Sequence, residues 1–404
     1  MTPDRLFLVP LALGHLALFV LVVNVVHGLG HPEHILSRAK AVFLALFALV
    51  SAVIAWEAWN GAILAWSWPS LAYAVVCVAT GLVLLPASTA YIHHRPRPAG
   101  IREQGTEIDL AATLGADALT GPGKYAWLLR LPGNESFRLR KVEWEVPMPG
   151  LPRALDGLSV LHLSDLHLAP CFDRRFFEAV IDEAADRPCD LVAFTGDLVD
   201  HDDAADWIVP LFSRLRGRLG SFAILGNHDL AHGPDRLRDL LVEAGFTDLE
   251  GGWATVESAG VRIALGGTSF PWGPALPTDQ RPRADFQILL SHVPDQFYWA
   301  ERAGFDLMLS GHNHGGQVRL PLVGPVFMPS RYSRRFDRGF FRKRGLTLHV
   351  SQGVAGKHPV RYGCRPEVGR LILRATGAAP KDTREDVRSR FDPDASDVSE
   401  GVLR

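Results

Sequence analysis

Side chains that can bind metal ions follow five short apolar runs in the C-terminal part of the chain. In chain order the five blocks are Asp165-Leu166-His167, Gly196-Asp197-Leu198-Val199-Asp200, Gly226-Asn227-His228-Asp229, Ser291-His292 and Gly311-His312-Asn313-His314. They combine carboxylate, imidazole and carboxamide groups without a thiolate, which suits Mn²⁺, Fe or Zn²⁺ better than Ca²⁺. One ion needs fewer ligands than these, and seven of the side chains fit two ions that share a bridging carboxylate.

A two-metal centre of this kind is suited to the hydrolysis of a phosphoester or phosphoanhydride bond. Two divalent ions neutralise phosphoryl oxygens and lower the pKa of bound water from about 15.7 to about 7. A nearby imidazole, with an unperturbed pKa of about 6.5, is suited to protonate the leaving oxygen. These residue types therefore favour in-line attack by metal-activated water.

The runs that precede the blocks have the length and composition of strands buried on both faces. They read LSVLHLSDLH, DLVAFTGD, SFAILGNHD, FQILLSH and FDLMLSGHNH, and LTLHVSQG is a sixth run of the same kind. Helical periodicity lies between some of them, at residues 172–184 and 237–244. Alternating strands and helices predict an α/β fold, in which ligands bind at the carboxyl ends of the strands. The glycines before Asp197, Asn227 and His312 would let the chain turn sharply there.

The order DxH, GDxxD, GNHD, strand-end His and GHxH resembles that of the calcineurin-like metallophosphoesterase superfamily. The resemblance implies a calcineurin-like β-sandwich flanked by helices. The surrounding sequences DGLSVLHLSDLHL, GHNHGGQVRLP and HPVRYGCRPEVGRLIL are similar to a branch of bacterial membrane-anchored phosphoesterases, some of them UDP-2,3-diacylglucosamine pyrophosphatases of lipid A synthesis. The vertebrate transmembrane protein with a metallophosphoesterase domain is similar too. Asn313 stands where the branch often has Thr, at a position that holds no metal.

The resemblance implies two ion sites joined by one bridging residue. The first site would hold Asp165, His167 and His314, the second Asn227, His292 and His312, and the bridge would be Asp197. His228 would protonate the leaving oxygen, and Asp229 would orient His228. Asp200 would either brace the site behind its ligands or be a plain surface residue. Two divalent cations are the expected cofactors, with Mn²⁺ preferred to Fe or Zn²⁺.

Three apolar stretches precede the soluble part, at residues 6–26, 41–59 and 68–92. At about 1.5 Å per residue the first can span a hydrocarbon core of about 30 Å, and it exceeds the apolar region of a signal peptide, about 7–15 residues long. Four tryptophans crowd the link between the second and third stretches, as at a membrane interface: Trp56, Trp59, Trp66 and Trp68. A buried three-helix globular domain is the alternative, but it would need a polar face. The sequence therefore predicts a three-helix transmembrane anchor over residues 1–92.

The cations that flank these stretches predict the orientation of the protein. With three spans, the first loop and the C-terminal region share one side, which carries Arg38, Lys40, Arg95, Arg97 and Arg102. The other side carries only Arg5. We therefore expect a multi-pass protein of the bacterial inner membrane with a cytoplasmic catalytic domain. Four scattered cysteines without a CxxC motif fit a reducing compartment.

Composition divides the remainder of the chain into three parts. Residues 93–136 are polar and rich in Gly and Ala, and predict a linker. Residues 137–375 predict the metallophosphoesterase domain. Residues 376–404 have almost no apolar side chains and predict a disordered tail.

A basic segment at residues 319–344 bears on the partners. It carries eight Lys and Arg residues against Asp337 alone, with phenylalanines interleaved. It is either a solvated charged loop or a surface that meets anionic headgroups. The 404-residue chain has a net charge of −2 and no visible nucleic-acid-binding motif, so we expect a phospholipid membrane and no nucleic acid as partner.

The expected function is hydrolysis of a phosphorylated lipid or nucleotide-lipid of the UDP-2,3-diacylglucosamine type, in the lipid A pathway. One alternative is a phosphodiesterase of small soluble substrates such as cyclic nucleotides. The other is a non-catalytic membrane scaffold whose metal site is structural. The intact set of ligand and acid positions counts against the scaffold.

Overall fold

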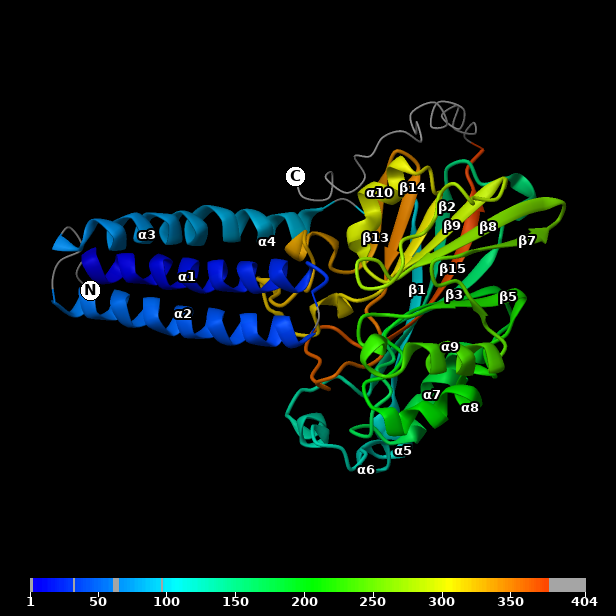
Figure 1. The fold of residues 1–404 in the computed structure, drawn as a ribbon, viewed down its shortest axis with the longest axis horizontal. Helices are drawn as coiled ribbons and strands as arrows, with labels where there is room; N and C mark the ends of the chain where they lie inside the picture. The colour runs from blue at the N-terminus through cyan, green and yellow to red at the C-terminus, as the bar shows by residue number, and fades with distance from the viewer. Residues whose placement is uncertain (1–2, 32, 61–64, 96, 378–404) are drawn as a thin grey trace.

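The computed structural model describes residues 3–31, 33–60, 65–95 and 97–377. Within them a bundle of long helices extends from one side of an α/β domain (Figure 1). The disordered tail expected at residues 376–404 lies outside the described residues from residue 378 onward.

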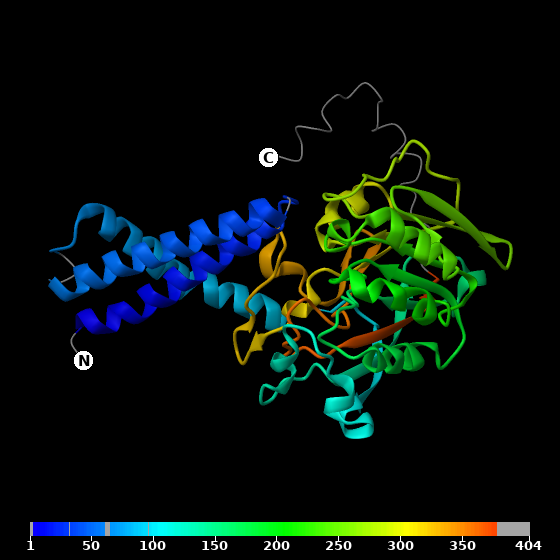
Figure 2. The same cartoon turned by 60° about the horizontal axis from the view of Figure 1, so that its bottom comes forward.

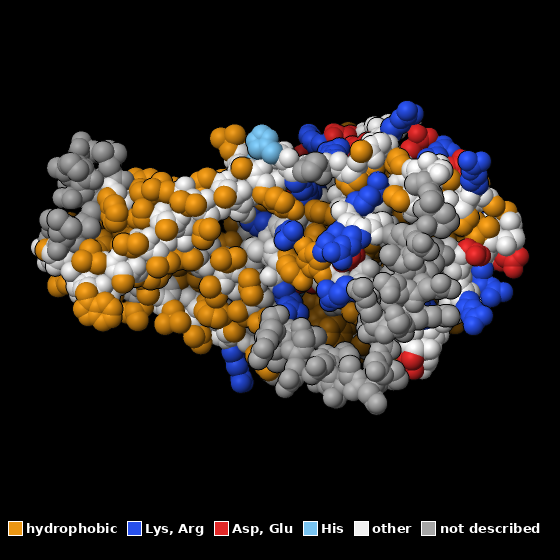
Figure 3. All heavy atoms as spheres, turned by 90° about the horizontal axis from the view of Figure 1, so that it is seen from above, with side chains coloured by type: hydrophobic (Ala, Val, Ile, Leu, Met, Phe, Trp, Pro, Cys, Tyr) orange, Lys and Arg blue, Asp and Glu red, His pale blue; other side chains and the backbone are white. Residues whose placement is uncertain are grey.

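The bundle consists of three helical segments, α1 (Pro3–His27), α2 (Glu33–Asn60) and a third from Trp68 to His94. The third is built from α3 (Trp68–Ala79), a π-helical turn (Thr80–Leu84) and α4 (Leu85–His94). All three are long and apolar enough to cross a membrane, with mean hydropathies of 2.3, 2.2 and 2.0. Apolar side chains cover the outer face of the bundle in Figure 3, and Lys and Arg side chains stand around its junction with the α/β domain. This apolar exterior favours a membrane anchor over a buried globular domain.

Two sheets form the α/β domain. The seven-stranded sheet has the order β1 (Arg102–Asp109), β2 (Arg138–Met148), β15 (Glu367–Ala375), β3 (Ser159–Leu163), β4 (Cys189–Thr195), β5 (Gly217–Ile224) and β6 (Thr247–Asp248). The six-stranded sheet has the order β13 (Gly339–Lys343), β14 (Leu346–Val350), β10 (Leu307–Ser310), β9 (Phe286–Ser291), β8 (Val261–Thr268) and β7 (Trp253–Ser258). A small hairpin pairs β11 (Arg319–Leu320) with β12 (Gly324–Pro325).

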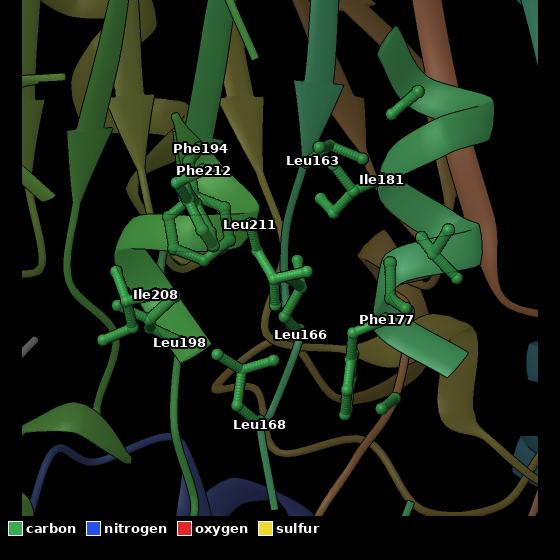
Figure 4. Close-up of a cluster of buried hydrophobic side chains, with 14 of the residues drawn as sticks. Leu163, Leu166, Leu168, Phe177, Ile181, Phe194, Leu198, Ile208, Leu211 and Phe212 are labelled. Carbon is green, nitrogen blue, oxygen red and sulfur yellow. The ribbon is translucent and has the colours of Figure 1, made fainter. Parts of the chain in front are cut away.

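The sheets pack face to face and carry helices on their outer faces. Buried residues of both sheets, such as Val160, Leu191 and Ile288, form one core cluster between them. A second cluster lies between the seven-stranded sheet and the helices α7 (Arg174–Ala185), α8 (Ile208–Phe212) and α9 (Pro234–Glu243) (Figure 4). Helix α10 (Phe297–Arg302) belongs to a third cluster with β9, β10 and β14 of the six-stranded sheet. The expected β-sandwich flanked by helices is confirmed.

The prediction of a linker at residues 93–136 is wrong, because most of this segment is part of the α/β domain. Strand β1 pairs antiparallel with β2 over its whole length, from Arg102↔Glu145 to Asp109↔Arg138. The following helices α5 (Leu110–Leu114) and α6 (Ala116–Leu119) place Leu110 and Leu119 in the core. Strand β1 is an exposed edge strand, and edge strands carry charged side chains that blunt aggregation. Its polarity therefore made it resemble a linker.

The order of the parallel strands brings the five blocks together. Strands β3, β4 and β5 are parallel neighbours in one sheet, and β8, β9 and β10 are parallel neighbours in the other. The five blocks directly follow β3, β4, β5, β9 and β10. Their side chains are therefore presented at the carboxyl ends of strands from both sheets. The segment that contains β11 and β12, gold in Figures 1 and 2, lies between these loops and the helical bundle.

Candidate metal centre

Apolar residues within the blocks fix the loops that carry the polar ones. Leu166 and Leu168 are fully buried in the core between the sheet and the helices, and Leu198 lies beside them (Figure 4). Asp165 and His167 alternate with these leucines. The alternation holds one set of side chains in the core and turns the other toward the site. Backbone bonds join the first two loops, since the N–H of Asp165 donates to the carbonyl of Gly196 at 2.9 Å.

The structure brings all seven expected ligands together. The possible ligand atoms of Asp165, His167, Asp197 and His314 lie within 4.8 Å of one another, and so do those of Asp197, His292 and His312. Asn227 joins the second group, with its Oδ1 3.1 Å from Nε2 of His292. Asp197 thus belongs to both groups. Its Oδ2 lies 3.4 Å from Nε2 of His167 and 3.3 Å from Nε2 of His292.

Each of the four histidines has one ring nitrogen bound to a fixed oxygen. The pairs are His167 Nδ1 with Asp200 Oδ2 at 2.9 Å, His292 Nδ1 with the Thr195 carbonyl at 2.7 Å, His314 Nδ1 with the Ala355 carbonyl at 3.1 Å, and His312 Nε2 with the Pro329 carbonyl at 2.8 Å. Carbonyl and carboxylate oxygens only accept hydrogen bonds, so these nitrogens carry the ring protons. The other nitrogen of each ring therefore turns a lone pair into the site, as in metal-ligating histidines.

The donor set fits bound cations because the inward-facing atoms repel one another without them. Nε2 of His167 and Nε2 of His314 are 3.1 Å apart, and Nε2 of His292 lies 3.2 Å from Nδ1 of His312. Lone pairs at these distances make no hydrogen bond with each other. Mixed nitrogen and oxygen ligands suit first-row divalent metals. The chemistry of the cluster therefore matches the expected two-cation site.

Electrostatics also favour positive charge between Asp197 and its neighbours. Burial opposes protonation of His292, but the carboxylate of Asp197 raises the pKa of that ring to about 9. The pKa of His312 falls to about 3, first because the ring is buried and then because His292 is close. A positive charge beside Asp197, whether a proton or a cation, is thus stabilised by this carboxylate.

Five of the seven expected ligands have left-handed backbone conformations. Their φ values are 54° at Asp165, 45° at His167, 55° at Asp197, 66° at His312 and 47° at His314. For residues other than glycine this conformation costs roughly 1–2 kcal/mol each. The sharp turns at the strand ends are therefore made largely by the ligands themselves.

The neighbouring glycines have two different roles. Gly196 has a φ of 93°, as the expected sharp turn requires. At Gly226 and Gly311 the requirement is space, because a Cβ atom at Gly226 would collide with Oδ1 of Asp197. A Cβ atom at Gly311 would collide with the side chains of Ser164 and Asp165. Both glycines let the backbone lie directly against the candidate ligands.

Asp200 links His228 to the cluster. One carboxylate oxygen lies 2.5 Å from Nδ1 of His228, and the other lies 2.9 Å from Nδ1 of His167. The side chain of Asp200 is only 6% exposed, so the surface alternative for this residue is wrong. Burial opposes protonation of His228, but Asp197 and Asp200 together raise the pKa of its ring to about 10. His228 is also 28% exposed and so reaches the open side of the cluster.

The expected role of Asp229 in orienting His228 is wrong. Its carboxylate instead accepts hydrogen bonds from three backbone N–H groups, at 2.8 Å from Leu198, 3.0 Å from Val199 and 2.8 Å from Gly226. Asp229 thus ties the loop after β4 to the loop after β5. The orienting carboxylate is Asp200, which belongs to another block and which adjacency in the sequence did not identify.

Sequence reasoning also missed the supports behind the histidines. The backbone carbonyls of Thr195, Pro329 and Ala355 determine which ring nitrogen of each histidine carries the proton. The position of a backbone carbonyl cannot be predicted from a pattern of side chains. Arg361, which is 1% exposed, donates to the Ala355 carbonyl at 2.7 Å and to the Gln352 carbonyl at 2.9 Å. The available signal for this support was a cation within the sequence HPVRYGC, which lies just after the last predicted strand run.

The comparisons with known proteins agree with this geometry. Residues 158–316 match the family model described as calcineurin-like phosphoesterase, and this range contains all five blocks. The chain is 29% identical over 277 residues to the uncharacterized metallophosphoesterase YkuE of Bacillus subtilis. This alignment covers 65% of this chain and 94% of that protein. It is 29% identical over 220 residues to the phosphodiesterase YaeI of Escherichia coli, with 53% and 81% covered.

The chain is also similar to an animal protein. The chain is 28% identical over 268 residues to the transmembrane protein with metallophosphoesterase domain of Danio rerio, with 58% of this chain and 57% of that protein covered. The family model, these relatives and the Asp and His cluster support one assignment. This chain contains a calcineurin-like metallophosphoesterase domain, joined to three apolar helices that are long enough to cross a membrane.

Proposed function

We propose that the domain holds two divalent cations and hydrolyses a phosphoester or pyrophosphate bond of a lipid or nucleotide-lipid. The position of Asp197 carries the two-cation part of the proposal. Its Oδ2 lies between His167 of one ligand group and His292 of the other, at 3.4 Å and 3.3 Å. Asp165 and His314 would complete the first site, and three residues would complete the second: Asn227, His292 and His312. Mn²⁺ is the preferred ion, and Fe or Zn²⁺ also suits the ligands.

When bound, the cations would neutralise phosphoryl oxygens and supply an activated water. The chain itself supplies the proton for the leaving group. Asp200 holds Nδ1 of His228, which leaves Nε2 of that ring as the atom that donates. The Asp197 and Asp200 carboxylates raise the pKa of this ring to about 10, which favours the protonated form that a general acid requires. The same Asp200 carboxylate holds Nδ1 of His167, so proton donor and candidate ligand are oriented together.

An apolar hairpin at residues 319–327 supports the membrane part of the proposal. Leu320 is 48% exposed, Leu322 is 85% exposed and Phe327 is 45% exposed. The hairpin lies beside the end of α4, where Nε2 of His93 is 3.0 Å from the Leu322 carbonyl. Exposed apolar side chains next to the end of a membrane-length helix suit the interface of a bilayer. A phospholipid surface at this end of the bundle would bring a lipid-borne phosphate close to the domain.

The basic segment 319–344 contributes less to membrane binding than its charge suggests. Arg319 pairs with buried Asp337 at 2.9 Å, Arg338 donates to Gln352, and Arg342 donates to the Pro147 carbonyl. Lys343 and Arg344 both pair with Glu301. These cations hold the segment against the domain. The exposed apolar tip of the hairpin is therefore the better candidate for contact with lipid.

The cations at one end of the helical bundle bear on the orientation of the protein in the membrane. The first loop and the α/β domain lie at the same end of the bundle (Figure 1), and this end carries the cations Lys40 and Arg95. An excess of flanking cations favours the cytoplasmic side. We propose a multi-pass protein of the bacterial inner membrane with a cytoplasmic catalytic domain and a role in lipid A synthesis.

The substrate class is tested with full-length protein and Mn²⁺ on a panel of phosphates. We expect faster hydrolysis of UDP-2,3-diacylglucosamine and other lipid phosphates than of cyclic nucleotides, because the domain is held beside a bilayer. The Asp197→Ala variant should abolish all activities, since the bridge between the two sites is lost. Preference for a cyclic nucleotide would favour the soluble-substrate alternative. Two bound ions without any hydrolysis would favour the scaffold.

The role of His228 is tested with His228→Ala. We expect kcat to fall about 10²- to 10⁴-fold, which is the usual contribution of a positioned general acid. The metal content should stay near two, because His228 is outside both ligand groups. His232→Ala is the matched control, since His232 belongs to the same loop and pairs with Asp202 on the surface. Equal loss of metal in His228→Ala would contradict the role of proton donor.

The close approach at Gly311 is tested by metal analysis. We expect Gly311→Ala to lose bound metal, because the added methyl collides with the side chain of Asp165. Gly252→Ala is the control, since its nearest neighbour, the Leu249 carbonyl, would lie 3.8 Å from the new Cβ atom. Unchanged metal content in Gly311→Ala would show that the loop adjusts without harm to the site.

Membrane contact of the hairpin is tested with Leu322→Cys carrying an environment-sensitive fluorophore. The four native cysteines are buried, so the label should report on the new position. In vesicles with anionic lipid we expect the emission of this label to be blue-shifted relative to the same label at a water-exposed position. Val242→Cys, on the exposed face of α9 away from the bundle, should show no shift. Equal emission from both positions in vesicles would argue against hairpin contact.

A further inference from the structure

Residues 326–331, the strap, lie between helix α1 and the candidate metal centre. Oδ1 of Asn24 accepts a hydrogen bond from the Met328 N–H at 3.0 Å, and Nδ2 of Asn24 donates to the Val326 carbonyl at 3.2 Å. Asn24 is 0% exposed and stands in a helix that is otherwise almost entirely apolar. A buried carboxamide is costly unless both ends are bonded, and here the strap backbone bonds both.

A second contact joins α1 to the strap just beyond the end of the helix. Gly28 packs so closely that a Cβ atom there would collide with the backbone of Ser330 and Arg331. One residue earlier, the ring of His27 lies edge-on to the ring of Phe327, with centroids 5.3 Å apart. Helix α1 therefore fixes the strap both by side-chain hydrogen bonds and by direct backbone contact.

The opposite side of the strap supports the second ligand group. The Pro329 carbonyl lies 2.8 Å from Nε2 of His312, and so holds the ring proton on that nitrogen. Asp295, three residues after His292, accepts from Oγ of Ser330 at 2.5 Å and from the Arg331 N–H at 2.7 Å. The strap thus contacts the loops of two of the three residues proposed for the second ion.

We infer that α1 is a working part of the metal centre, with Asn24 and Gly28 as positioning residues for His312. By holding the strap they keep the Pro329 carbonyl on Nε2, so that Nδ1 of His312 faces the second ion. This inference rests on the proposed two-cation site. Loss of the partners that orient metal-ligating histidines typically weakens metal affinity 10- to 100-fold. The membrane helices therefore support binding of the second cation in addition to attaching the domain to the bilayer.

The test compares variants of full-length protein by Mn²⁺ titration against a chelator. In Asn24→Leu and in Gly28→Ala we expect one of two ions to bind about 10- to 100-fold more weakly and the other to keep its affinity. Thr80→Val is the matched control for Asn24, since Oγ1 of buried Thr80 donates to the Val76 carbonyl within the same helical segment. Gly252→Ala is the control for Gly28, since the nearest atom to a Cβ at Gly252, the Leu249 carbonyl oxygen, would lie 3.8 Å away. Both controls should keep both affinities.

Two further readouts separate positioning from general loss of stability. In metal-free protein, tryptic cleavage at Arg331 should be faster in Asn24→Leu than in Thr80→Val, because only the former releases the strap. In the His312→Ala background, Asn24→Leu should cause no additional loss of metal affinity, because Asn24 affects the metal only through His312.

The outcomes distinguish this inference from the function on which it rests. Wild-type affinity for both ions in Asn24→Leu and Gly28→Ala would overturn the inference and leave the two-cation proposal standing. Equal weakening in the variants and in both controls would also overturn it, because the effect would not be specific to the strap. Fewer than two ions in the wild-type protein would overturn the proposed centre, whatever the variants show. If Asn24→Leu fails to fold, Gly28→Ala alone decides.

Discussion

The mutual repulsion of buried lone pairs is the constraint on which the rest of the site depends. Two imidazoles crowd the Asp197 side chain, since Nε2 of His167 and Nε2 of His292 each lie within 3.4 Å of its Oδ2. Fixed carbonyls hold ring protons of His292 and His312 on the far nitrogens, so the inward lone pairs repel one another unless a proton or a cation comes between them. Only positive charge relieves this arrangement. The left-handed turns, the glycines without room for a methyl group and the buried Arg361 all serve to hold it in place.

The two sheets divide the site between them. Loops after β3, β4 and β5 of the seven-stranded sheet bring Asp165, His167, Asp197 and Asn227, while loops after β9 and β10 of the six-stranded sheet bring the remaining three histidines. Asp197 is the contact point, since it reaches across to His292. The apolar core between the sheets therefore sets the separation of the two ligand groups, and a shift of one sheet against the other would disturb both at once.

How well the sequence predicted each feature depended on how far apart in the chain the residues that form it lie. The seven ligands were predictable because each lies in a short block after an apolar run, and strand ends converge in this fold class. The role of Asp229 was not, because neighbours in the sequence direct their side chains to different places. Strand β1 was mistaken for a linker because an edge strand is as polar as a loop. The bond between Asn24 and Met328 spans 304 positions, and no local pattern reveals such a contact.

The three apolar helices and the metallophosphoesterase domain are therefore better understood as one structural unit. A membrane helix that only attached a domain would need no polar residue at its domain end, since burial of an unpaired carboxamide costs several kcal/mol, roughly 2–7 by transfer measurements. In α1 both the oxygen and the nitrogen of that carboxamide are hydrogen-bonded to the strap, whose Pro329 carbonyl orients His312. The apolar hairpin continues from the same segment toward the end of α4. One stretch of chain thus connects the helices, the proposed lipid contact and the second ion site, so the geometry of the centre depends on how the bundle is seated.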